Sequence, residues 1–115
     1  MIVSKTPYRI PLSGGGTDVD FYYKKFGSKF ISASVNEYVY VFFTERKLDK
    51  NHMIQTSVVE FAKKVKDIKH ALIRETIRYF GLKENFQIST VSTVPTSTGL
   101  GTSSAMVVGL INCIK

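Results

Sequence analysis

The chain has 115 residues, of which 43% are hydrophobic and 12% aromatic, a size and composition typical of one soluble globular domain. A single cysteine excludes an internal disulfide, and the longest apolar stretch, residues 38–43, is far shorter than the ~20 residues that cross a bilayer. The net charge of +7 permits nucleic-acid binding, but the basic residues fall in loops and on solvated helix faces without stacking aromatics, which argues against it.

The N-terminal quarter is predicted to be a strand, a loop and a short helix. Two prolines exclude a helix from Ile2 to Ile10, so this segment should be extended. Pro11 to Thr17 should be a loop, because three successive glycines cost too much backbone entropy in a regular element. Asp18 is then a candidate N-cap for a short helix that Gly27 ends.

Two sequential strands should follow and pair antiparallel. Lys29 to Val35 and Glu37 to Glu45 are rich in β-branched and aromatic residues, with Asn36 between them. Residues 46–51 form a polar turn, and His52 to Ser57 can add one more short strand.

The second half alternates helices and a strand. Apolar residues recur at three- and four-residue steps from Asp67 to Phe80, which predicts an amphipathic helix. Asn85 to Val94 alternates like a half-buried strand. The chain is helical again from Thr102, with Cys113 as a small core residue.

The two histidines, His52 and His70, stand apart from each other and from any cysteine or cluster of carboxylates. No metal-ligand spacing is visible in the sequence. Each histidine is expected at the surface or half-buried.

The segment Pro95–Ala105 is the clearest candidate for a site. Gly99 and Gly101 let the backbone come close to an anion, and Thr102, Ser103 and Ser104 place hydroxyls and free N–H groups at a helix N-terminus. The sequence matches neither the Walker pattern nor the dinucleotide pattern. The simpler alternative is a glycine turn with a Ser or Thr N-cap.

This segment, Pro-x-x-x-Gly-Leu-Gly-Thr-Ser-Ser-Ala, resembles the second motif of the GHMP kinases. Pro7–Asp18, which contains Gly-Gly-Gly-Thr-Asp, resembles their first motif in its sugar-kinase form, most like heptose 7-phosphate kinases and fucose-salvage kinases. The resemblance implies an α+β fold of the ribosomal protein S5 domain 2 type. It also implies that residues 1–115 are an incomplete N-terminal domain that stops in mid-helix, before the catalytic aspartate, the third motif and the C-terminal domain. On that expectation the chain alone is inactive, and the last helix exposes Met106, Val107, Leu110 and Ile111.

The same resemblance implies roles for individual residues. Nucleotide phosphates would contact residues of the glycine loop and the following helix turn: Pro95, Ser97, Thr98, Gly99, Leu100, Gly101, Thr102, Ser103 and Ser104. Ser103, or else Thr102, would ligate Mg²⁺. Arg9 would stabilise charge near the reacting groups, unless it is an ordinary surface arginine. Gly14, Gly15, Gly16, Thr17 and Asp18 would bind the sugar, with Asp18 accepting hydroxyl hydrogen bonds, capping a helix, or both.

The function implied is ATP-dependent phosphorylation, with magnesium, of a sugar or sugar phosphate resembling D-glycero-D-manno-heptose 7-phosphate. A cytoplasmic location is expected because no secretory signal is visible. The alternatives are a nonenzymatic nucleic-acid-binding module on the same fold and a remnant that only binds partners. The sequence leaves the oligomeric state open.

Overall fold

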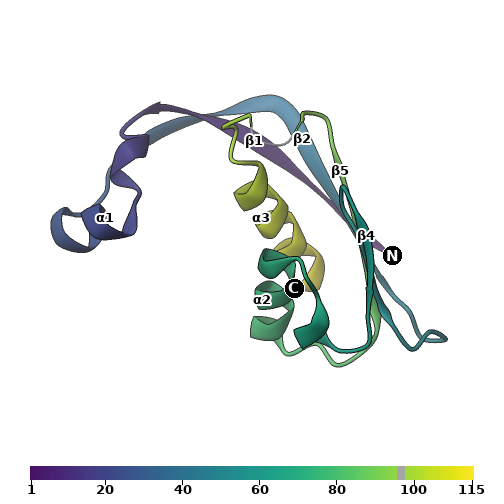
Figure 1. Ribbon diagram of the computed structural model, residues 1–115. Coiled ribbons are helices and arrows are strands. Elements are labelled where there is room, and N and C mark those ends of the chain that lie inside the picture. The colour runs from purple at the N-terminus through teal and green to yellow at the C-terminus, as the bar shows by residue number, and fades with distance from the viewer. Residues whose placement is uncertain (96–97) are drawn as a thin grey trace.

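A computed structural model describes residues 1–95 and 98–115. It shows one five-stranded sheet with helices α2 and α3 against one face (Figure 1). The elements in chain order are β1 (Ile2–Ser13), the 3-10 turn η1 (Gly15–Thr17), α1 (Asp20–Phe26), β2 (Ile31–Glu45), β3 (His52–Gln55), β4 (Val59–Ala62), the 3-10 turn η2 (Val65–Asp67), α2 (Ala71–Phe80), β5 (Phe86–Ser92) and α3 (Thr102–Ile114). None of the helices described is long and apolar enough to span a membrane.

The sheet order is β1-β2-β5-β3-β4. All neighbouring pairs are antiparallel except β3 and β5, which run parallel. The α+β class expected from the sequence is confirmed.

The core lies between the sheet and the two helices. Strand residues with alternating inward side chains, such as Val41, Ile54 and Ile88, meet Ile73 and Ile77 of α2. Each of these five side chains is 0% exposed. Burial of aliphatic side chains of this size stabilises the fold by roughly 1.5–3 kcal/mol each.

Helix α3 is covered more completely than the sequence suggested. Met106 and Leu110 are 8% and 0% exposed, because α3 packs on β1, β2 and α2. The expectation that both would be exposed is wrong, while Val107 and Ile111 are half-buried. Cys113 is buried as predicted, and its thiol donates to the carbonyl oxygen of Val41 at 3.4 Å.

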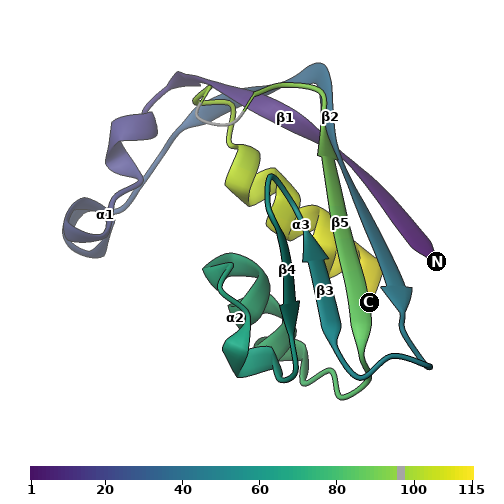
Figure 2. The ribbon, with the colours of Figure 1, turned by 45° about the vertical axis from the view of Figure 1, so that its right-hand side comes forward.

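The C-terminal end of β1 and the N-terminal end of β2 extend beyond the rest of the sheet. Helix α1, which connects them, therefore lies away from the other helices (Figures 1 and 2). Strand β1 continues through Pro11 to Ser13, so the loop predicted from Pro11 begins too early. A proline is tolerated there because β1 is an edge strand. Residues 14–18 retain the turn, with η1 inside it.

The two strands predicted around Asn36 are one strand, β2. The expected interruption appears instead as an irregularity in pairing: Pro7 lies opposite Tyr38, whereas Arg9 lies opposite Ser34. A bulge of this kind bends the strand without ending it.

Three boundaries also differ from the prediction. Helix α1 begins at Asp20 with Val19 as N-cap, so Asp18 does not cap it. Helix α2 begins at Ala71, because residues 65–67 form η2 and the chain is extended at Ile68. Strand β3 ends at Gln55, and β4 was not predicted. His52 is 4% exposed, and so it is neither at the surface nor half-buried as predicted, because it faces the core from β3.

Candidate functional site

The glycine loop leads from β5 into α3 through two left-handed residues. Gly99 and Gly101 have φ of 73° and 72°, a region that favours glycine. Gly101 is the N-cap of α3, and its carbonyl oxygen accepts the first helical bond, from the N–H of Ala105 at 2.9 Å. The predicted turn and helix start are therefore confirmed in position.

No described side chain caps the N-terminus of α3. The simpler prediction of a Ser or Thr N-cap is wrong, because the N-cap is Gly101. Backbone N–H groups in the first turn of a helix have no intrahelical partner, and they carry the positive end of the helix dipole. Thr102 is half-buried here, while Ser103 and Ser104 are exposed. This turn presents amide and hydroxyl groups suited to an anion.

Arg9 of β1 contacts the same loop. Its backbone N–H donates to the carbonyl oxygen of Leu100 at 3.1 Å. A Cβ at Gly101 would lie 3.4 Å from Arg9 Nε, so the guanidinium stem runs along the glycine. The Arg9 guanidinium carbon also lies 5.9 Å from the ring centroid of Phe30. The structure thus brings the first and second sequence motifs together at Arg9.

A cleft of about 420 Å³ opens beside the glycine loop. One wall carries Thr102 and Ser103 from α3 together with Val94 and Pro95. The remaining lining residues come from the sheet, the β3–β4 turn, the N-cap of α2 and α3: Tyr8, Val39, Thr56, Ser57, His70, Thr90, Ser92 and Met106. The volume is that of a small-molecule site.

Most of those lining residues were not predicted. Tyr8 is 1% exposed, and its hydroxyl lies 2.7 Å from Ser92 Oγ. This pair joins β1 to β5 across β2 at the floor of the cleft. Nothing local in the sequence marks Tyr8 or Ser92, because their proximity depends on the strand order.

The predicted sugar-binding segment lies further along β1, towards α1. Thr17 Oγ1 donates to the carbonyl oxygen of Gly14 at 2.7 Å, and Thr17 also contacts Ser28 and Lys29. A Cβ at Gly14 would lie 2.2 Å from the carbonyl oxygen of Lys29, so this close approach of the two backbone segments requires glycine. Asp18 is exposed.

Around Gly15 and Gly16 the space is more open. A Cβ at Gly15 would meet Pro11 at 3.6 Å, and one at Gly16 would have no described neighbour within 4 Å. Sugar binding by Gly14–Asp18 stays a prediction. The binding of nucleotide phosphates by the glycine loop also stays a prediction. In that loop Thr98 is exposed, and Ser97 lies outside the described residues.

Comparison with known proteins gives consistent results. Residues 60–115 match the family model of the GHMP kinases N terminal domain. The chain is 31% identical over 121 residues to D-glycero-alpha-D-manno-heptose 7-phosphate kinase of Campylobacter jejuni, covering 96% of this chain and 36% of that protein.

Solved structures show the same fold. A D-glycero-D-manno-heptose 1-phosphate kinase from Bacteriodes thetaiotaomicron superposes with a TM-score of 0.80 at 27% identity, covering 98% of this chain and 40% of that one. Mevalonate kinase of Methanococcus jannaschii gives a TM-score of 0.70 at 19% identity, with 98% and 39% covered. The chain therefore spans 36–40% of the length of these relatives.

Proposed function

We propose that this chain, whose residues 60–115 match the family model of the GHMP kinases N terminal domain, provides the nucleotide-binding part of a kinase that transfers phosphate from ATP to a sugar phosphate. The observation that carries the proposal is the glycine loop entering α3 beside the cleft. Amide and hydroxyl groups at a helix N-terminus bind phosphate through hydrogen bonds and the helix dipole.

Each part of the loop has a task in this proposal. Gly99 and Gly101 hold the backbone in the left-handed region, so that Thr102 and Ser103 face the cleft. Thr98, Gly99, Leu100, Gly101 and the first turn of α3 surround the phosphates. Arg9 adds a positive charge at the same place, where it would neutralise charge that develops on the transferred group.

The residues present fit a magnesium ion that is bound mostly through nucleotide phosphates. Ser103 is exposed on the cleft wall and offers a neutral oxygen ligand, a type that Mg²⁺ accepts alongside phosphate oxygens. No group of three or more His, Cys, Asp or Glu side chains gathers in a metal-binding arrangement among the described residues. Ser103 would hold the ion, which would offset the negative charge of the phosphates.

The acceptor substrate in this proposal is a heptose phosphate. Two relatives named above are heptose phosphate kinases, at 31% and 27% identity. Gly15, Gly16 and exposed Asp18 would receive the sugar, with the Asp18 carboxylate accepting hydrogen bonds from hydroxyls. ATP and sugar phosphates are cytoplasmic metabolites, so a cytoplasmic location forms part of the proposal.

The test is calorimetric titration of the 115-residue chain with ATP, with and without magnesium. Binding is measured rather than turnover, because the chain spans 36% of the curated relative. Saturable binding that requires magnesium supports the proposal. Affinity for RNA that falls steeply with salt, without magnesium-dependent ATP binding, would favour the nucleic-acid alternative instead.

A further inference from the structure

His70 stands on the cleft wall in a fixed orientation. It is the N-cap of α2, and its Nδ1 accepts the N–H of Ile73 at 3.4 Å. A ring nitrogen that accepts a hydrogen bond carries no proton, so Nε2 is the N–H donor of this ring. Among residues 1–95 and 98–115, the hydrogen bond at Nδ1 is the one that the His70 ring makes.

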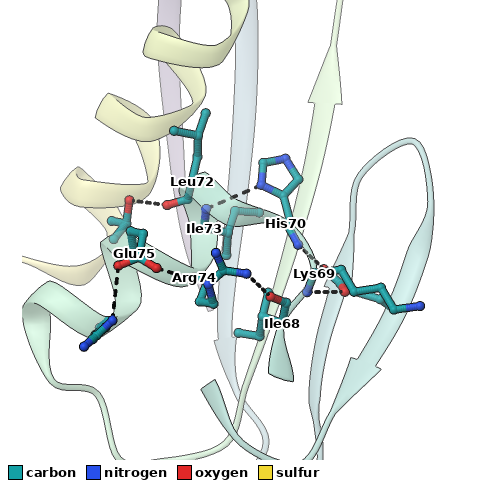
Figure 3. Close-up of polar contacts among 10 residues, drawn as sticks. Ile68, Lys69, His70, Leu72, Ile73, Arg74 and Glu75 are labelled. Atoms are coloured by element: carbon teal, nitrogen blue, oxygen red, sulfur yellow. Dashed lines mark hydrogen bonds and ion pairs between the residues drawn. The ribbon is translucent and has the colours of Figure 1, made fainter. Parts of the chain in front are cut away.

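The backbone that carries this ring is also held. The carboxylate of Glu60 in β4 accepts the N–H of Lys69 at 2.8 Å and the N–H of His70 at 3.2 Å. Figure 3 shows the imidazole with one nitrogen turned to Ile73 and the other directed away from α2. His70 therefore presents a preorganised N–H donor, with main chain and side chain both fixed.

The chemistry around His70 differs from that at the glycine loop. Apart from the wall that carries Thr102, Ser103, Val94 and Pro95, the cleft that His70 lines includes the hydroxyl residues Thr56 and Ser57 and the apolar residues Val39 and Met106. None of the described lining residues is Lys or Arg. The phosphates have Arg9 and the N-terminus of α3 at the other wall, whereas the neutral donors and apolar side chains that share the cleft with His70 suit a flat, uncharged heterocycle.

We propose that His70 contacts the base of the nucleotide, donating from Nε2 to a ring-nitrogen or carbonyl acceptor, while Glu60 acts as the positioning residue behind it. This inference rests on the proposed function, because it takes the phosphates to lie at Thr102 and Ser103. His70 then governs affinity for the base and has no part in binding the phosphates.

The experiment compares magnesium ATP with magnesium tripolyphosphate, which has the phosphates but no base, on the full 115-residue chain. The first variant is His70→Asn, since asparagine is a good N-cap and keeps an acceptor for Ile73 while its shorter side chain withdraws the donor. We expect the Kd for ATP to rise about 3- to 10-fold, the value of one hydrogen bond. The Kd for tripolyphosphate and the Tm should stay unchanged.

Two further variants complete the test. Glu60→Gln should raise the Kd for ATP by a smaller factor and also leave tripolyphosphate binding unchanged, because the ring is displaced but present. Thr76→Ala removes a hydroxyl that bonds the Leu72 carbonyl within α2, and serves as the control with both Kd values unchanged.

The outcomes separate the two ideas. If the unmodified chain binds neither ligand, the proposed function fails and this inference falls with it. If the unmodified chain binds both and His70→Asn binds ATP equally well, the inference alone is overturned. It is also overturned if His70→Asn raises the Kd for ATP and the Kd for tripolyphosphate by the same factor, since His70 would then act on the phosphates.

Discussion

The backbone N–H of Arg9 donates to the carbonyl oxygen of Leu100 at 3.1 Å, across 91 positions of sequence. This bond ties the edge strand β1 to the glycine loop, and it places the Arg9 stem against Gly101. Because the bond uses main-chain atoms, it persists when the side chain is changed. The charge of Arg9 can therefore be tested without loosening the loop.

We expect Arg9→Gln to raise the Kd for magnesium tripolyphosphate about 10-fold, since hydrogen bonds to charged groups contribute roughly 1.5 kcal/mol or more. The Tm should change little. Lys5→Gln removes the same charge from the same strand, at a side chain whose Nζ lies over the Tyr38 ring at 3.9 Å. An equal rise of the Kd for magnesium tripolyphosphate in both variants would mean that only net charge matters and that Arg9 is an ordinary surface arginine.

Ser103→Ala should abolish most of the magnesium-dependent gain in ATP affinity, a loss on the order of 10-fold or more, as expected for removing a metal ligand or its support. ATP affinity measured in EDTA should be unchanged. Asn112→Ala, at an exposed position of the same helix, is the control. If Thr102→Ala abolishes the magnesium-dependent gain in ATP affinity and Ser103→Ala does not, the metal ligand is Thr102 and not Ser103.

Gly109→Ala tests the packing of α3 on the sheet. A Cβ at this position would lie 2.8 Å from Ser4 Oγ and 2.9 Å from Val41 Cγ2. Alanine is otherwise favoured over glycine inside a helix, so the overpacking must exceed that gain. We expect the free energy of unfolding to fall by about 1–3 kcal/mol in urea denaturation. A stabilised variant would contradict this close approach.

The sequence predicts the elements near the glycine loop better than the contacts that complete the cleft. The strand before Gly99 and the helix after Gly101 follow from local periodicity and glycine chemistry. The Tyr8–Ser92 contact and the place of His70 depend on the order of strands, which no local pattern encodes. Asn36 predicts a break because its residue type disfavours strands, but residues on both sides of it pair with β1, and the strand continues through an irregularity in that pairing.

Asp18→Asn should leave the Tm unchanged, because Val19 is the N-cap of α1 and Asp18 is exposed. It should weaken binding of heptose 7-phosphate while ATP binding stays constant, since the lost carboxylate accepts sugar hydroxyls in the proposed function. Asp20→Asn is the matched control at the start of α1, where the carboxylate pairs with Lys24 at 2.6 Å. Equal effects of both variants on sugar binding would remove Asp18 from the site.

The last prediction concerns the buried histidine of β3. The ring of His52 is 4% exposed and stacks on Phe86 with centroids 4.3 Å apart. Its Nδ1 is buried without a hydrogen-bond partner among the described residues. Burial disfavours the charged ring and lowers the pKa of His52 below its ordinary 6.5.

The unfolded chain therefore takes up a proton at His52 before the folded chain does. The free energy of unfolding should be constant above about pH 7.5 and should decrease as the pH falls from 7 to 5, by at most about 1.4 kcal/mol per pH unit for one group. His52→Phe keeps an aromatic ring on Phe86 and should flatten this slope, whatever its absolute stability.

Asp49→Asn is the control for that measurement. The hydrogen bond from Arg46 lowers the pKa of the Asp49 carboxyl, so its titration lies below this pH window and the slope should persist. Urea denaturation at pH 5, 6 and 7 measures all three proteins. A slope that survives in His52→Phe would show that another group, and not the buried His52, links protonation to unfolding.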